Sequence, residues 1–160
     1  MAAKDRAPTA SPCDQELQIT RSFDAPRALV FAAWTEPEHL ARWSGPEGFT
    51  IIPDQSDIRE GGAYRTCLRS PEGTDHWVRG VYRDISAPAR LVFTHQWEDE
   101  GGRPGPQTVV TVTFAEQGAA TTLMTFHQAF FDSVASRDGH REGWSSSFDG
   151  LAKHLARVAA

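Results

Sequence analysis

Hydrophobic and polar residues alternate along several short stretches of this chain, which is the pattern of strands that bury one face. The first stretch, residues 16–23, places Leu17, Ile19 and Phe23 on one side with polar residues between them. Pro53 lies in the second stretch and makes that strand an edge strand or a bulged one. The further predicted strands, each bounded by turn residues, are residues 50–60, 63–69, 77–85, 91–98, 108–114 and 121–126.

Two short helices are predicted between the first strand and the second. Pro26 suits the first turn of a helix that runs to Trp34. Thr35 and Glu38 have the spacing of a capping box, with Thr35 as the N-cap residue of the second helix. The sequence Ser-Gly-Pro at residues 44–46 ends that helix.

The last part of the chain is predicted to be one amphipathic helix that begins near Asp138. Its apolar side chains recur at i, i+4, i+7 and i+11, and they are Trp144, Phe148, Leu151 and Leu155. Gly143 and Gly150 lie on a neighbouring strip, although a glycine inside a helix costs about 1 kcal/mol relative to alanine. We therefore expect the helix to lie across a curved sheet with a cavity between them.

The order of these elements predicts an α+β fold: one strand, two short helices, six or so antiparallel strands and a long helix. Short turns between consecutive strands are typical of antiparallel pairing. Residues 1–14 are rich in Ala, Pro and Ser, and we interpret them as a disordered tail. Residues 15–160 are expected to form a single domain, a length that can bury a sizeable core.

Composition excludes several classes of function. A net charge of −5 without a Lys/Arg cluster argues against nucleic-acid binding, and no stretch approaches the ~20 apolar residues of a membrane span. The scattered histidines, with Cys13 and Cys67 far from any His or Cys partner, do not fit a zinc site. We expect no metal, no cofactor and no disulfide, and the low cysteine content suits the cytoplasm.

Short motifs in a fixed order carry a family resemblance over residues 18–155. They are Arg21-Ser22-Phe23-Asp24-Ala25-Pro26, Val30-Phe31, Trp34-Thr35, Arg42-Trp43, Asp57-Ile58-Arg59 with Gly61-Gly62, Leu91-Val92-Phe93-Thr94, Val112-Thr113-Phe114, His127-Gln128-Ala129-Phe130, and Gly143-Trp144 with Leu151 and Leu155. Together they resemble the heat-shock protein 90 ATPase activator homologue-like (AHSA-type) family of the START-related (SRPBCC) helix-grip superfamily. The resemblance implies a helix-grip fold, in which a seven-stranded sheet holds the C-terminal helix with a cavity between them.

Aromatic and polar residues of the predicted strands and helices are the candidates for lining this cavity. They are Trp34, Trp43, Phe49, Tyr64, Trp77, Phe93, His95, Trp97, His127, Trp144, Ser147 and Phe148. His95 and His127 could contact a ligand or be hydrogen-bonded structural histidines. Arg79 could point inward beneath Trp77 and bind a carboxylate, but the rarity of buried arginine favours the outward orientation.

Three functions suit this fold, and binding of a small molecule is the first. Its ligand would be apolar, aromatic or lipid-like, with a polar end. The second is a cavity enzyme of the cyclase, dehydratase or hydrolase type, with His95 or His127 as acid or base. The third is an ATPase-activator-like module that binds a chaperone. We favour the first function, assign no catalytic residue, and leave a homodimer open.

Overall fold

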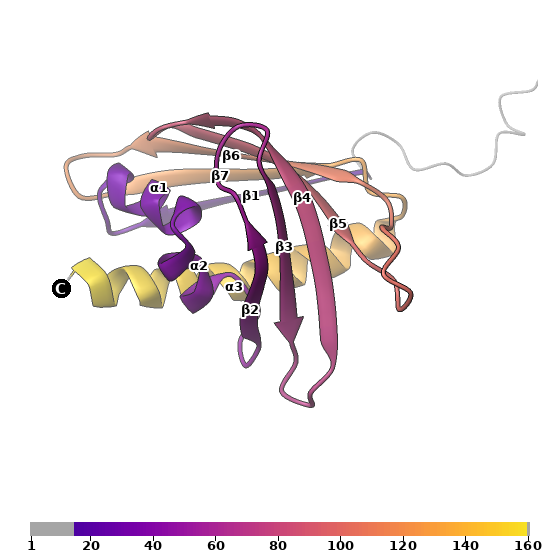
Figure 1. Cartoon of the computed structure of the whole chain (residues 1–160). Helices are drawn as coiled ribbons and strands as arrows, with labels where there is room; N and C mark the ends of the chain where they lie inside the picture. The colour runs from indigo at the N-terminus through magenta and orange to yellow at the C-terminus, as the bar shows by residue number, and fades with distance from the viewer. Residues whose placement is uncertain (1–14, 160) are drawn as a thin grey trace, which may run out of the picture.

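A computed structural model of the chain describes residues 15–159 (Figure 1). Its elements are β1 (Glu16–Phe23), α1 (Arg27–Thr35), α2 (Pro37–Trp43), β2 (Thr50–Ser56), β3 (Ala63–Arg69), β4 (Asp75–Ser86), β5 (Arg90–Trp97), β6 (Thr108–Glu116), β7 (Thr122–Ala129) and α3 (Val134–Ala159). The strands form one seven-stranded sheet in the order β1-β7-β6-β5-β4-β3-β2. The α+β helix-grip fold is confirmed; the expected tail, residues 1–14, lies outside the described residues.

The first strand joins the sheet beside the last one. β1 pairs antiparallel with β7, so that Ile19 lies opposite Phe126. The chain then passes through α1 and α2 to the far edge of the sheet, where β2 pairs with β3. All later strands pair with their sequence neighbours, as short turns require. The two helices therefore close one end of the curved sheet (Figure 1).

The junction between α1 and α2 differs from the capping prediction. Thr35 is the last residue of α1, and its hydroxyl donates a hydrogen bond to the carbonyl of Phe31 at 3.0 Å. Glu36 is the N-cap residue of α2 and makes no side-chain cap hydrogen bond; Pro37 begins the helix. The predicted capping box is wrong because the Thr35 hydroxyl is already bonded within the preceding helix.

Helix α3 begins at Val134, a turn earlier than predicted, and lies along the concave side of the sheet (Figure 1). Phe148, Leu151 and Leu155 are fully buried against the sheet and α1, whereas Trp144 is half-buried. These residues follow the predicted apolar stripe. Burial of each large apolar side chain stabilises the packing by roughly 1.5–3 kcal/mol.

The sheet contributes its side of the core by strict alternation. In β6, Val110, Val112 and Phe114 point toward the helices and are buried, and Thr113 between them is exposed. Register shifts interrupt β2 next to Pro53, as the proline predicts, and β4 next to Tyr82. Such bulges increase the local twist, which suits the strongly curved half of the sheet formed by β2 to β5.

Candidate functional site

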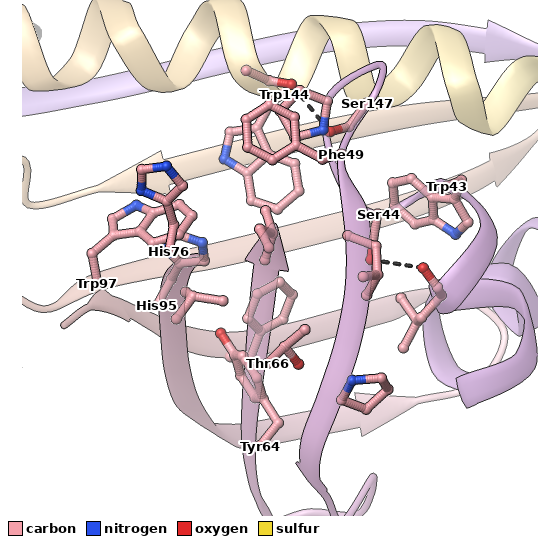
Figure 2. Close-up of a pocket in the computed structure, with 18 of the residues that line it drawn as sticks. Trp43, Ser44, Phe49, Tyr64, Thr66, His76, His95, Trp97, Trp144 and Ser147 are labelled. Carbon is pink, nitrogen blue, oxygen red and sulfur yellow. Dashed lines mark hydrogen bonds between the residues drawn. The ribbon is translucent and has the colours of Figure 1, made fainter. Parts of the chain in front are cut away.

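A cavity of about 500 Å³ lies between α3, α2 and the half of the sheet formed by β2 to β5 (Figure 2). Alternate residues of each strand reach it. These are Ile51, Pro53 and Gln55 of β2, Tyr64, Thr66 and Leu68 of β3, His76, Val78 and Tyr82 of β4, and Phe93, His95 and Trp97 of β5. Helix α3 contributes from Ala135 to Ser147, and the first two helices contribute Trp34, Leu40 and Trp43.

Helix α3 leaves this space because the residues that face it are small. Gly139, Gly143 and Ser147 line the cavity on successive turns, and nothing lies within 4 Å of where a Cβ would stand at Gly139 or Gly143. The glycines thus face open space rather than a close helix–strand contact. The cavity is a consequence of helix composition as well as sheet curvature.

Stacked aromatic rings form the inner end of the cavity. The Trp34 ring contacts Trp43 and Trp144, with ring centroids 4.8 and 6.0 Å apart. Trp144 also packs on Phe126, with centroids 4.7 Å apart. Phe148 is completely buried beneath this cluster rather than exposed to the cavity. Offset and edge-to-face ring pairs of this kind add to the stability gained by area burial.

A buried hydrogen-bond network holds the polar end of the cavity. The indole Nε1 of Trp144 donates to Gln128 Oε1 at 2.8 Å, and Gln128 Nε2 donates to Thr108 Oγ1 at 2.8 Å. The Thr108 hydroxyl donates to the carbonyl of His95 at 2.9 Å. Gln128 Nε2 also lies 3.5 Å from Nδ1 of His95. Each side chain of this hydrogen-bond network is thereby oriented by its neighbour.

A second pair beside His95 is equally well defined. Trp97 Nε1 donates to Nε2 of His140 at 2.9 Å, and Nδ1 of His140 donates to the carbonyl of Ser136 at 2.7 Å. Both ring nitrogens of His140 are therefore satisfied by the neutral ring. The His95 ring lies 5.4 Å from Trp97 and 5.8 Å from His140, centroid to centroid. Trp97 and His95 stand together at one end of the cavity, and Trp43 stands at the other (Figure 2).

Burial shifts the titration of the cavity side chains toward their uncharged forms. It lowers the pKa of His95 to about 3, with a smaller contribution from His140. It raises the pKa of Tyr82 to about 12 and that of Tyr64 well above its ordinary value. The Tyr64 hydroxyl donates to the carbonyl of Thr94 at 2.7 Å. At neutral pH these three side chains are therefore uncharged.

The structure brings together most of the residues that the sequence singled out. Around the cavity lie Trp34, Trp43, Phe49, Tyr64, Phe93, His95, Trp97, Trp144 and Ser147. Three others do not line it, namely Trp77, His127 and Phe148. Residues that the prediction missed include Gln128, which orients His95, and His140, which pairs with Trp97. The alternation of β7 places Gln128 on the same face as the apolar Phe126, a signal that was available in the sequence.

Trp77 lies on the opposite face of the sheet from the cavity. The guanidinium of Arg65 stacks on it, 4.0 Å from the ring centroid. The same guanidinium donates to both carboxylate oxygens of Glu98, at 2.7 and 2.8 Å, and Arg79 lies 3.6 Å from Glu98. Arg79 therefore faces outward, and its alternative as an inward carboxylate ligand is wrong. Val78 occupies the inward position that Trp77 was expected to hold.

His127 also lies on that outer face, where its Nε2 is 2.6 Å from Oε1 of Glu16. The neighbours Phe126 and Gln128 point inward and are fully buried, so His127 must point away because strand residues alternate. His127 thus has the structural role that was one of the two alternatives for it. Because its side chain lies on the opposite face of the sheet from the cavity, His127 cannot act there as an acid or a base.

A histidine pair connects α2 to α3 outside the cavity. Nδ1 of His39 lies 2.7 Å from Nε2 of His154, and the other nitrogen of His39 lies 3.6 Å from Glu36. Burial lowers the pKa of His154, and His39, Arg157 and Arg42 lower it further.

Across residues 15–159, no cluster of three or more His, Cys, Asp or Glu side chains is suited to hold a metal. No helix in the same range is both long and apolar enough to cross a membrane.

Comparison with known proteins identifies the family. Residues 24–156 match the family model described as Activator of Hsp90 ATPase homolog 1-like protein. The chain belongs to this family. No curated protein matches the chain. The family resemblance drawn from the short sequence motifs is confirmed.

Solved structures of bacterial proteins share the fold of this Activator of Hsp90 ATPase homolog 1-like chain. The AHSA1 protein from Silicibacter pomeroyi is 26% identical, with a TM-score of 0.82 over 89% of this chain and 99% of that one. A protein from Chromobacterium violaceum is 25% identical, with a TM-score of 0.80 over 88% and 96%. A protein from Arthrobacter aurescens is 25% identical, with a TM-score of 0.83 over 92% and 90%. The matches therefore span nearly the whole of each protein.

Proposed function

We propose that this protein binds a small apolar molecule, aromatic or lipid-like with one polar end, in the cavity between α3 and the sheet. The observation that carries the proposal is the character of the cavity wall. A space of about 500 Å³ is bounded mainly by aromatic and aliphatic side chains, with the histidines gathered toward one end. Concave apolar sites with a few oriented polar groups are typical of small-molecule binding.

The unfilled space between α3 and the sheet supports a binding function rather than a purely structural role of these side chains. Four of the lining side chains are tryptophans, namely Trp34, Trp43, Trp97 and Trp144, yet they leave the space unfilled. Protein cores normally pack with few voids larger than a water molecule. A cavity of this size lowers stability relative to a packed core, and binding of a ligand would offset that cost.

The test is a titration with N-phenylnaphthylamine, a neutral apolar dye whose emission rises in apolar surroundings. Thr66 lines the cavity, and Thr113 is exposed on the outer face of β6. We expect saturable binding to the wild-type protein and to Thr113→Phe. Thr66→Phe fills part of the cavity and should weaken binding by about tenfold or more. Equal affinity of the two variants, or no saturable binding by wild type, would contradict the proposal.

A further inference from the structure

The wall of the cavity lacks the acidic and strongly basic side chains that would pair with a charged ligand, which restricts the ligands that it can hold. Of the described residues, those that line it include no Lys, Arg, Asp or Glu. Its titratable groups are three histidines and two tyrosines: His76, His95, His140, Tyr64 and Tyr82. His76 is exposed at the rim. A charged ligand group would therefore enter without a counter-ion.

The network behind His95 determines which of its ring nitrogens carries the hydrogen. An indole N–H can only donate, so the Gln128 atom that receives the bond from Trp144 must be the amide oxygen. The amino group of Gln128 then points toward Thr108 and Nδ1 of His95. Nδ1 faces a donor and must be the acceptor in the neutral ring. The hydrogen is therefore on Nε2.

Nε2 of His95 is one donor of the cavity wall that remains free, and Nε1 of Trp34 is another. Among residues 15–159 the only hydrogen bond of the ring is the one at Nδ1. The side chain is 7% exposed and lines the cavity. Nε2 is not among the fully enclosed side-chain atoms that lack a partner, so an oxygen of a bound molecule can reach it from the cavity and accept its hydrogen. The neighbouring Trp97 and His140 satisfy each other and leave His95 as the polar contact at this end.

We propose that His95 selects the ligand through its Nε2–H, and that it selects an uncharged oxygen acceptor, such as a ketone, ester or alcohol, over a carboxylate. This inference rests on the proposed binding function. A neutral acceptor completes the hydrogen bond at His95. A carboxylate in the same place would be desolvated with no cation nearby, and burial of an unpaired ion costs far more than one hydrogen bond returns.

Matched ligands separate these contributions. The probes are three β-substituted naphthalenes of nearly equal shape: the methyl ketone, the carboxylate and the ethyl compound, each titrated calorimetrically at pH 7.5. We expect the ketone to bind roughly five- to tenfold more tightly than the ethyl compound, through one additional hydrogen bond. The carboxylate should bind at least about a hundredfold more weakly than the ketone. The comparison is repeated with the methyl ketone, the carboxylate and the ethyl compound that carry a flexible decyl chain in place of the naphthalene ring.

Two variants assign the preference to His95. His95→Phe keeps an aromatic ring and removes both nitrogens, so the ketone should lose its advantage over the ethyl compound. His127→Phe makes the same replacement on the outer face and should preserve that advantage. If the carboxylate binds as tightly as the ketone, or if His95→Phe keeps the ketone preference, the inference is wrong and the binding function stands. If no member of either series binds, the binding function itself fails and this inference fails with it.

Should His95→Phe not fold, the comparison of ketone, ethyl compound and carboxylate on the wild-type protein still tests the preference for an uncharged oxygen. Selection of an uncharged oxygen requires the stated order of affinities, and the reverse order for ketone and carboxylate overturns it. The wild-type comparison does not depend on any substitution.

Discussion

Replacement of His95 by Phe should remove much of the pH dependence of stability between pH 7 and pH 5. His95 is buried in the folded protein, where its pKa is about 3. In the unfolded chain its pKa returns to the ordinary value of 6.5. The unfolded state therefore binds the proton more readily. Stability from this group is fully present above about pH 6.5 and is lost as the pH falls below that value toward 3.

The size of the effect follows from the two pKa values. At pH 5 nearly all of the unfolded chains carry a proton on His95, and almost none of the folded molecules do. The linkage relation then gives a loss of about 2 kcal/mol in the free energy of unfolding between pH 7 and pH 5. The window lies above the range in which Glu98 titrates, because a hydrogen bond from Arg65 lowers the pKa of that carboxyl.

Urea unfolding at pH 7, 6 and 5 measures this difference for wild type, His95→Phe and His127→Phe. We compare only the change with pH within each protein, so a general loss of packing in a variant cancels. The curve for His95→Phe should be flatter than that of wild type by about 2 kcal/mol over the window, and His127→Phe should leave this part of the pH dependence in place. Parallel curves for wild type and His95→Phe would refute the assignment of His95 as a buried neutral histidine.

Three further predictions concern the rest of the fold. Arg65→Ala should lower Tm more than Arg69→Ala, because Arg65 neutralises the buried Glu98 whereas Arg69 pairs with the half-exposed Asp75; thermal unfolding compares the two, and equal shifts would contradict the argument. Gly143→Ala should raise the free energy of unfolding by up to about 1 kcal/mol, whereas Gly80→Ala should be strongly destabilising because its Cβ would overlap the Thr94 carbonyl. Urea midpoints distinguish the two variants, and destabilisation by Gly143→Ala would show that the fold requires glycine at this position of α3. His39→Leu should cost roughly 1 kcal/mol at pH 8, because it removes one partly buried hydrogen bond. The cost should be smaller at pH 5, since the variant also loses a group that lowers the pKa of His154; a cost that grows toward pH 5 would be inconsistent with this pairing.

The elements of this fold were largely predictable because their signals are local. Alternation in β6 and β7 and the apolar stripe of α3 each appear within a few residues of one another, and the structure follows them. The start of α3 was placed too late, since residues 134–137 carry no apolar stripe of their own. The capping-box prediction failed because the Thr35 hydroxyl bonds to the carbonyl of Phe31 in the preceding helix instead.

The site was less predictable, because alternation shows which residues share a face and not which face points inward. Trp77 illustrates the difficulty: it was predicted to line the cavity, yet it lies on the outer face of the sheet, where Arg65 of a neighbouring strand stacks on its ring. The wrong placement of His127 in the cavity was avoidable, since the apolar neighbour Phe126 already indicated which residues of β7 point inward. Gln128 was passed over because a glutamine at an inward position gives no sign of its partners, which come from β5, β6 and α3.

Native mass spectrometry of the protein, purified gently from its own host, tests the central claim most directly. If the cavity binds an apolar molecule, the folded protein should carry an added mass that disappears on denaturation. The released compound should be an uncharged molecule with at least one oxygen, as selection by His95 requires. A folded protein with the mass of the chain alone, unchanged after incubation with a lipid extract of that host, would contradict the claim that this cavity is a ligand-binding site.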